Sequence, residues 1–166
     1  MSALAEFRII DTNKLNDLKE KAEIKTIKKG WFKKVKIDEF WSFFDSNSNK
    51  LKDFDWSGYV FGNLLIFLQE NKMINILDSE HDSIANWISE KRGISTIILT
   101  KTHKESYLEK LNSINITIEE LIEFNKEFSE DSDPEFAKAG LEGVKAISEN
   151  LEILTDDSKV IILTVR

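Results

Sequence analysis

Apolar residues recur along this chain at two spacings, which separate expected strands from expected helices. Short runs rich in β-branched residues predict strands, which cover residues 7–10, 73–77, 94–100 and 160–165. A lysine-rich run over 24–37, with Gly30 near its turn, predicts a β-hairpin. Apolar residues three and four positions apart predict helices, which begin near residues 12, 38, 57, 80, 102, 117 and 134.

Several of these helices have sequence signals at their ends. Thr117 and Glu120 have the spacing of a capping box, as do Thr102 and Glu105 in the preceding helix. Pro134 stands at an expected first helical position, where its missing N–H costs nothing, and Gly93 stands where the helix after residue 80 is expected to end in a left-handed cap. These signals predict helix starts more firmly than apolar spacing alone.

The order of elements predicts an α+β fold. The expected strands at 73–77 and 94–100 flank a helix, so we predict a βαβ unit over residues 73–100 with parallel strands. We expect a mixed sheet of about five strands covered by helices. The chain has 166 residues, which fits a single globular domain over 1–166.

The only two histidines each follow an expected parallel strand by four residues. His81 comes four residues after Leu77 of the run 73–77, and His103 comes four residues after Leu99 of the run 94–100. Because parallel strands bring their carboxyl ends to one edge of a sheet, we expect the two rings to meet there. His81, His103 and Glu80 are the catalytic candidates of an acid/base site, and His81, His103 and Asp78 are the metal candidates. The alternative is that both histidines are solvated first-turn residues of helices.

Basic and aromatic residues concentrate in the first half of the chain. Six lysines lie within residues 25–36, and 11 of the 17 aromatic residues lie between 31 and 67. Most of these aromatics are expected in the core, while exposed ones mark contact surfaces. The predicted binding residues are Trp31, Phe32, Trp56 and Tyr59. Basic residues interleaved with aromatics also fit nucleic acid, and lysines also protect sheet edges from aggregation.

The composition narrows the class of function. The formal net charge is −7, which argues against nucleic acid and an anionic membrane as partners, and no apolar stretch is long enough to span a membrane. There is no cysteine and no secretory signal, so we predict a cytoplasmic location. Nucleophile-elbow, phosphate-loop, dinucleotide and zinc-protease motifs are all missing, and no cofactor is predicted.

These observations favour a non-catalytic protein that binds another protein. Size, acidity and the lack of catalytic motifs resemble those of small cytosolic bacterial proteins, including immunity proteins that neutralise toxins. An immunity-type or adaptor role is therefore predicted, and the oligomeric state is left open. The alternative is a metal- or acid/base-assisted enzyme, or a small-molecule-binding domain, that uses His81 and His103.

Overall fold

The computed structural model describes residues 3–29 and 33–166. Its strands are β1 (Ala5–Asp11), β2 (Lys25–Lys29), β3 (Lys33–Ile37), β4 (Ser48–Lys50), β5 (Ser95–Leu99) and β6 (Lys159–Val165). Its helices are a 3-10 turn η1 (Thr12–Lys14), α1 (Leu15–Lys21), α2 (Phe40–Asn47), α3 (Val60–Lys72), α4 (Asp82–Arg92), α5 (Lys101–Ser113), α6 (Ile118–Ser129) and α7 (Pro134–Ile153).

Four strands form one antiparallel sheet in the order β4-β1-β6-β5. The last strand of the chain, β6, lies between β1 and β5 and pairs with both along most of its length. Its sequence is apolar over consecutive residues, because both of its faces are buried. The sheet edges are β4, which has three residues, and β5, which has five.

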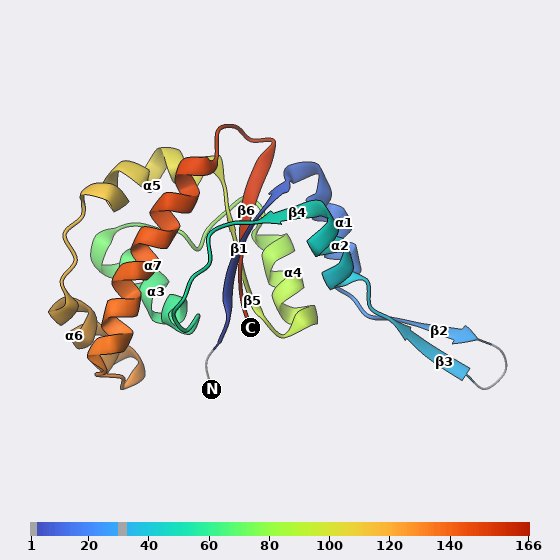
Figure 1. Cartoon of the computed structure of the whole chain (residues 1–166), viewed down its shortest axis with the longest axis horizontal. Coiled ribbons are helices and arrows are strands. Elements are labelled where there is room, and N and C mark those ends of the chain that lie inside the picture. The colour runs from blue at the N-terminus through green and yellow to red at the C-terminus, as the bar shows by residue number, and fades with distance from the viewer. Residues whose placement is uncertain (1–2, 30–32) are drawn as a thin grey trace.

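The sheet separates two hydrophobic cores (Figure 1). One face packs against α3, α5, α6 and α7, and the other against α1, α2 and α4. Alternation along β6 supplies both cores, since Ile161 and Leu163 enter the first and Val160 and Ile162 enter the second. The helices therefore form a layer on each side of one sheet.

The predicted α+β class is confirmed, as are the best helix signals. Thr117 and Glu120 form a reciprocal capping box at the start of α6. Pro134 is the first residue of α7, and Gly93 ends α4 in the left-handed conformation with φ 65°. These features depend on neighbours in sequence, which is why local reasoning located them.

The predicted mixed sheet and βαβ unit are wrong. Residues 73–77 form no strand, and β5 pairs only antiparallel with β6 in the described part of the chain. Met73 takes the left-handed conformation that ends α3, and the Leu77 N–H donates to Asn75 Oδ1 at 3.1 Å. Ile74 and Ile76 are both buried in the first core. The segment thus alternates buried and less buried residues as a strand does, but its Leu77 N–H bonds to the nearby Asn75 side chain instead of to a neighbouring strand.

The hairpin predicted over 24–37 is confirmed as a separate two-stranded ribbon, β2 and β3. We call residues 25–37 the arm and the rest of the chain the body. The arm projects from the body beside α1 and α2 (Figure 1). Its strands pack extensively only on each other.

Replacing each of two glycines near the start of α3 by alanine is expected to change the stability of the fold in opposite directions. A Cβ on Gly58 would lie 2.9 Å from the Ala5 N atom and 3.0 Å from Val165 Cγ1, so Gly58→Ala should destabilise the fold by about 1–3 kcal/mol. A Cβ on Gly62 would meet nothing within 4 Å, so Gly62→Ala should stabilise the first turn of α3 by up to about 1 kcal/mol. Urea unfolding of both variants measures these changes. Equal effects of the two substitutions would contradict this packing.

Candidate functional site

The ring of His103 is buried, with 3% of its surface exposed, and both of its nitrogens have partners. Its Nδ1 atom accepts the Thr100 N–H at 3.0 Å, and its Nε2 atom lies 2.9 Å from the carbonyl oxygen of Asp78. A nitrogen that accepts an N–H carries no proton, so Nε2 carries the ring proton and donates it to Asp78. His103 therefore ties the loop before α4 to the start of α5.

This contact belongs to a helix cap. Thr100 is the N-cap of α5 and forms a capping box with His103, two residues before the box predicted at Thr102 and Glu105. Burial lowers the pKa of His103 below its ordinary value, which favours the neutral ring that both hydrogen bonds require. The capping box was predicted two residues too late because its N3 position is occupied by His103, where a glutamate is more usual.

The other candidates around His81 lie at the start of α4. His81 precedes the first helical residue, and its Nε2 atom is 3.4 Å from Glu80 Oε1. The carboxylate of Asp78 accepts from Asn75 Nδ2 at 2.6 Å. Within residues 3–29 and 33–166, no three histidine, aspartate or glutamate side chains are grouped to hold a metal ion. The two parallel strands that were predicted to bring the rings of His81 and His103 together do not form, because residues 73–77 are not a strand.

The arm has two chemically different faces. Because paired residues of a hairpin share a face, Ile27 and Val35 stand together on one side, and Lys28 and Lys34 stand together on the other. Ile27 is 44% exposed, and Val35 is half-buried. Lys28 and Lys34 are exposed, and no carboxylate of the described residues lies within ion-pair distance of either. An isolated two-stranded ribbon is marginally stable, and like charges directly opposite weaken it further.

Ion pairs fix the base of the arm on the body. Asp38 follows β3 directly and receives both terminal nitrogens of Arg92, at 3.0 and 2.7 Å. This guanidinium lowers the pKa of Asp38. The next residue, Glu39, lies 3.1 Å from Lys21, which is the last residue of α1 before the arm. The chain directly after β3 is thus held by two charged contacts.

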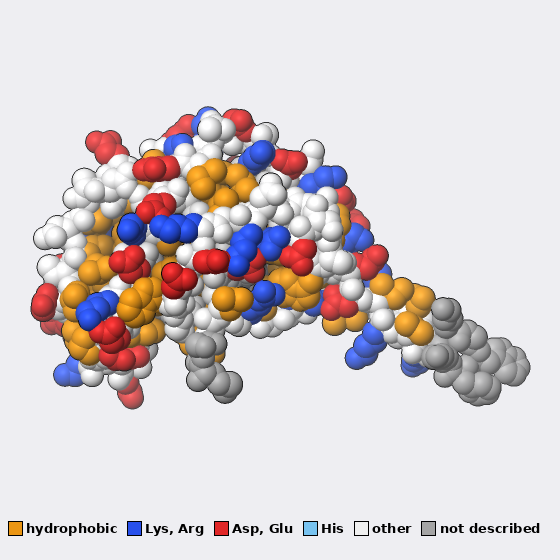
Figure 2. Space-filling view, in the orientation of Figure 1, with side chains coloured by type: hydrophobic (Ala, Val, Ile, Leu, Met, Phe, Trp, Pro, Cys, Tyr) orange, Lys and Arg blue, Asp and Glu red, His pale blue; other side chains and the backbone are white. Residues whose placement is uncertain are grey.

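Charge is divided unevenly between the arm and the body. The arm contains six lysines and no acidic residue, which gives it a formal charge of +6. The body has 17 basic and 30 acidic side chains, a formal charge of −13. Figure 2 shows blue and orange side chains on the described part of the arm, with the red carboxylates over the body.

The predicted binding residues fall in two places. Trp31 and Phe32 lie outside the described residues. Trp56 and Tyr59 are on the body, where they are 37% and 57% exposed. They flank Ala3, which lies between two hollows of the surface.

Other aromatics of the same region are covered by arginines. Phe40 and Phe44 are buried in the second core, and Trp41 packs against them. The guanidinium of Arg8 lies 5.1 Å from the Phe44 ring centre, and that of Arg166 lies 4.4 Å from the Trp41 ring centre. Stacked arginines therefore explain how consecutive aromatics fit on one short helix.

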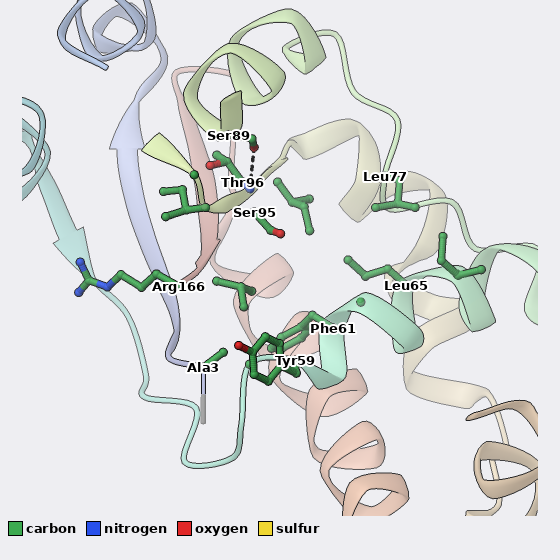
Figure 3. Close-up of a pocket in the computed structure, with 16 residues that line it drawn as sticks. Ala3, Tyr59, Phe61, Leu65, Leu77, Ser89, Ser95, Thr96 and Arg166 are labelled. Atoms are coloured by element: carbon green, nitrogen blue, oxygen red, sulfur yellow. Dashed lines mark hydrogen bonds between the residues drawn. The ribbon is translucent and has the colours of Figure 1, made fainter. Parts of the chain in front are cut away.

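An apolar pocket of about 660 Å³ lies between β5 and α3, and we call it the β5–α3 pocket. Tyr59, Phe61 and Leu65 form its α3 side, Ser95 and Thr96 lie on its β5 side, and Leu77 lies at one end (Figure 3). The Arg166 side chain extends away from this space. Sequence reasoning missed the pocket, although Gly62, which with Asn63 interrupts the apolar run 59–68, was a signal of an open helix face.

Comparison of the chain with protein-family models, curated proteins and solved structures finds no match. Within the part of the chain that the structure describes, no helix combines the length and the apolar character needed to cross a membrane.

The buried ring of His103 predicts a pH-dependent stability. Because the pKa of His103 is lowered in the folded chain, the unfolded chain binds more protons than the folded chain once the pH falls toward and below about 6.5. The free energy of unfolding should therefore decrease from about pH 7 to about pH 5. His103→Gln should remove that part of the decrease, whereas His81→Gln should retain it. Chemical unfolding at several pH values measures the three proteins. Parallel pH profiles of the wild type and His103→Gln would contradict a buried neutral ring.

Proposed function

We propose that this chain is a non-catalytic cytosolic protein that binds another protein, and that the arm makes the principal contact. The observation that carries the proposal is the uncovered ribbon itself. Its apolar face leaves Ile27 exposed to solvent, and its strands pack on no other element to any extent in the described chain. Such a face gains free energy when a partner covers it.

The fixed base of the arm supports this role. Arg92–Asp38 and Lys21–Glu39 hold the chain directly after β3 to α4 and to the end of α1, which precedes the ribbon. A ribbon whose direction is set before binding loses less conformational entropy on association than a free loop would. The arm is therefore suited to enter a cleft or to lie along a surface of its partner.

The charge distribution favours an acidic protein surface over nucleic acid. The +6 arm attracts carboxylates and would steer their approach. A nucleic acid long enough to contact the arm also meets the field of a body with a charge of −13. A folded acidic partner can present its carboxylates to the arm and turn the rest of its surface away from the body.

The geometry gives less support to the enzyme alternative. Both ring nitrogens of His103 are engaged in hydrogen bonds within the fold. A general base or a metal ligand needs a free nitrogen lone pair, and Nδ1 uses its lone pair on the Thr100 N–H. The ring therefore fits a structural contact better than a catalytic one.

The proposal is tested with the full chain as bait in a nuclease-treated lysate of its source cells at about 0.15 M salt. A captured protein is then purified and its binding to the full chain is measured by calorimetry. We expect a defined stoichiometry and an association rate that falls with added salt, because oppositely charged surfaces are screened. Recovery of no protein that binds after purification would overturn the proposal, as would recovery of nucleic acid alone from a parallel lysate without nuclease.

Two matched double variants locate the contact on the arm. Lys28→Glu with Lys34→Glu should reduce the affinity at least about tenfold, because repulsion replaces attraction at the interface. Lys126→Glu with Lys159→Glu makes the same change of net charge on exposed positions of the body. This control pair should change the affinity by no more than about threefold. Equal losses in the two proteins would show that net charge, rather than the arm, controls binding.

A single substitution should move stability and affinity in opposite directions. Lys28 and Lys34 are directly opposite in the ribbon, so Lys34→Glu creates a pair of opposite charges and should stabilise the arm by about 0.2–1 kcal/mol. Amide exchange in β2 and β3 should slow, while the affinity for the partner falls. A purely structural role of Lys34 predicts no loss of affinity.

A further inference from the structure

The arm carries a basic stripe on one of its two faces. Lys28 and Lys34 are directly opposite each other in the ribbon, and Lys36 lies two residues beyond Lys34 on the same face. All three side chains are exposed. Like charges placed directly opposite each other weaken a pair of strands. The stripe therefore lowers the stability of the arm until carboxylates of another surface approach it.

The opposite charge is concentrated on α6 and on the loop that follows it. Residues 118–133 contain seven acidic residues and one lysine, a formal charge of −6 against the +6 of the arm. Glu119, Glu123 and Glu127 follow one another at four-residue steps, so they form a stripe along one side of the helix. All three are exposed, and no basic side chain that the structure describes lies within ion-pair distance of them. This stripe also repels itself, since like charges four residues apart destabilise a helix.

The two stripes have similar repeats. Four helical residues advance about 6 Å along α6, so neighbouring carboxylates of the acidic stripe are about that far apart along the helix axis. Two strand residues advance about 7 Å along β3, which separates Lys34 from Lys36. A ribbon laid along α6 can thus place successive lysines opposite successive glutamates. The agreement in sign, total charge and spacing identifies α6 as a binding surface for the arm.

One copy of the chain cannot make this contact within itself. The arm projects beside α1 and α2, which pack on one face of the sheet, whereas α6 packs on the other face (Figure 1). The arm and α6 also lie toward opposite ends of the longest axis of the molecule (Figure 1). The arm can therefore reach α6 only on a second copy.

We propose that the arm of each copy lies along α6 of a second copy, so that two chains side by side in opposite directions form a two-fold dimer. This arrangement engages both arms through two equal contacts and closes, as most homo-oligomers do. The inference rests on the proposed function for the arm as a contact surface, and it names a second copy of this chain as a partner of that surface. Because the second copy uses the same lysines as a different acidic protein, the two occupants exclude each other.

The test measures the mass of the full chain by sedimentation equilibrium, with no other protein present. Exposed ion pairs are individually weak and are screened by salt, so we expect a reversible monomer–dimer equilibrium. The dissociation constant should rise at least about tenfold between about 0.05 M and about 0.3 M salt. A monomer at every concentration up to about 0.5 mM at the lower salt, or a dimer that salt leaves unchanged, would overturn the inference.

Charge reversal on each surface locates the contact. Lys28→Glu with Lys34→Glu should weaken the dimer at least about tenfold, because the arm then repels α6. Glu123→Lys with Glu127→Lys should do the same from the other side. An equal mixture of the two double variants should recover a one-to-one dimer, because the reversed arm meets the reversed helix and the native arm meets the native helix. Recovery would also show that both variants fold, whereas a mixture that stays monomeric would overturn the contact.

A third double variant controls for net charge. Glu109→Lys with Glu142→Lys reverses two exposed carboxylates of α5 and α7, so it changes the net charge by the same amount as the α6 pair. Its dissociation constant should differ from that of the wild type by no more than about threefold. A loss equal to that of the α6 pair would overturn the assignment of the contact to α6.

The dimer and the proposed function can fail separately, because the mass measurement needs no other protein. A monomeric wild type that still captures a different protein through the arm would overturn the dimer alone. A wild-type dimer for which no other protein is captured would overturn the proposed function alone.

Discussion

The pairing of β6 with both β1 and β5 is the interaction on which the structure depends. These pairs join the last strand of the chain to the first and to a strand from the middle. Because β6 is apolar on both faces, it also supplies side chains to both cores. The helices on either side pack against a sheet that exists only when the chain ends have met, so the contacts that close the fold are non-local.

Charged side chains on β1 and at the end of β6 form a partly buried cluster beside the aromatic residues of α2. Glu6 on β1 is 8% exposed and lies 2.7 Å from Arg8 and 3.3 Å from Arg166. The two arginines cover the rings of Phe44 and Trp41 with their planar groups. Arginine can pair with Glu6 and cover a ring at once, because the guanidinium donates hydrogen bonds from its edge while its flat face stacks on the aromatic ring. The aromatic rings of α2 are thereby covered by arginine side chains, with no further helix or strand packed over them in the described chain.

The arm and the β5–α3 pocket are two places where the described part of the fold leaves apolar surface uncovered. The arm exposes Ile27 and basic side chains, and its described strands pack extensively on no helix. The pocket is an apolar hollow between β5 and α3. The backbone of β5 and of the residue after it is satisfied by side chains at two positions, since Ser89 and His103 accept the N–H groups of Thr96 and Thr100.

The sequence by itself determined the helix ends, the hairpin and the α+β class, because these follow from residues within a few positions of one another. Thr117 acts through its side-chain oxygen, which accepts the Glu120 N–H, and Pro134 and Gly93 act through their own backbone conformation. Any fold would use these three residues in the same way. Tertiary structure decided the rest. Residues 73–77 alternate like a strand, but β6 occupies the inner edge of β5, and the backbone of 73–77 turns to Asn75 instead. The place of His103, the open wall at Gly62 and the projection of the arm likewise depend on which distant segments meet, since burial and hydrogen-bond partners across the chain are not contained in local spacing.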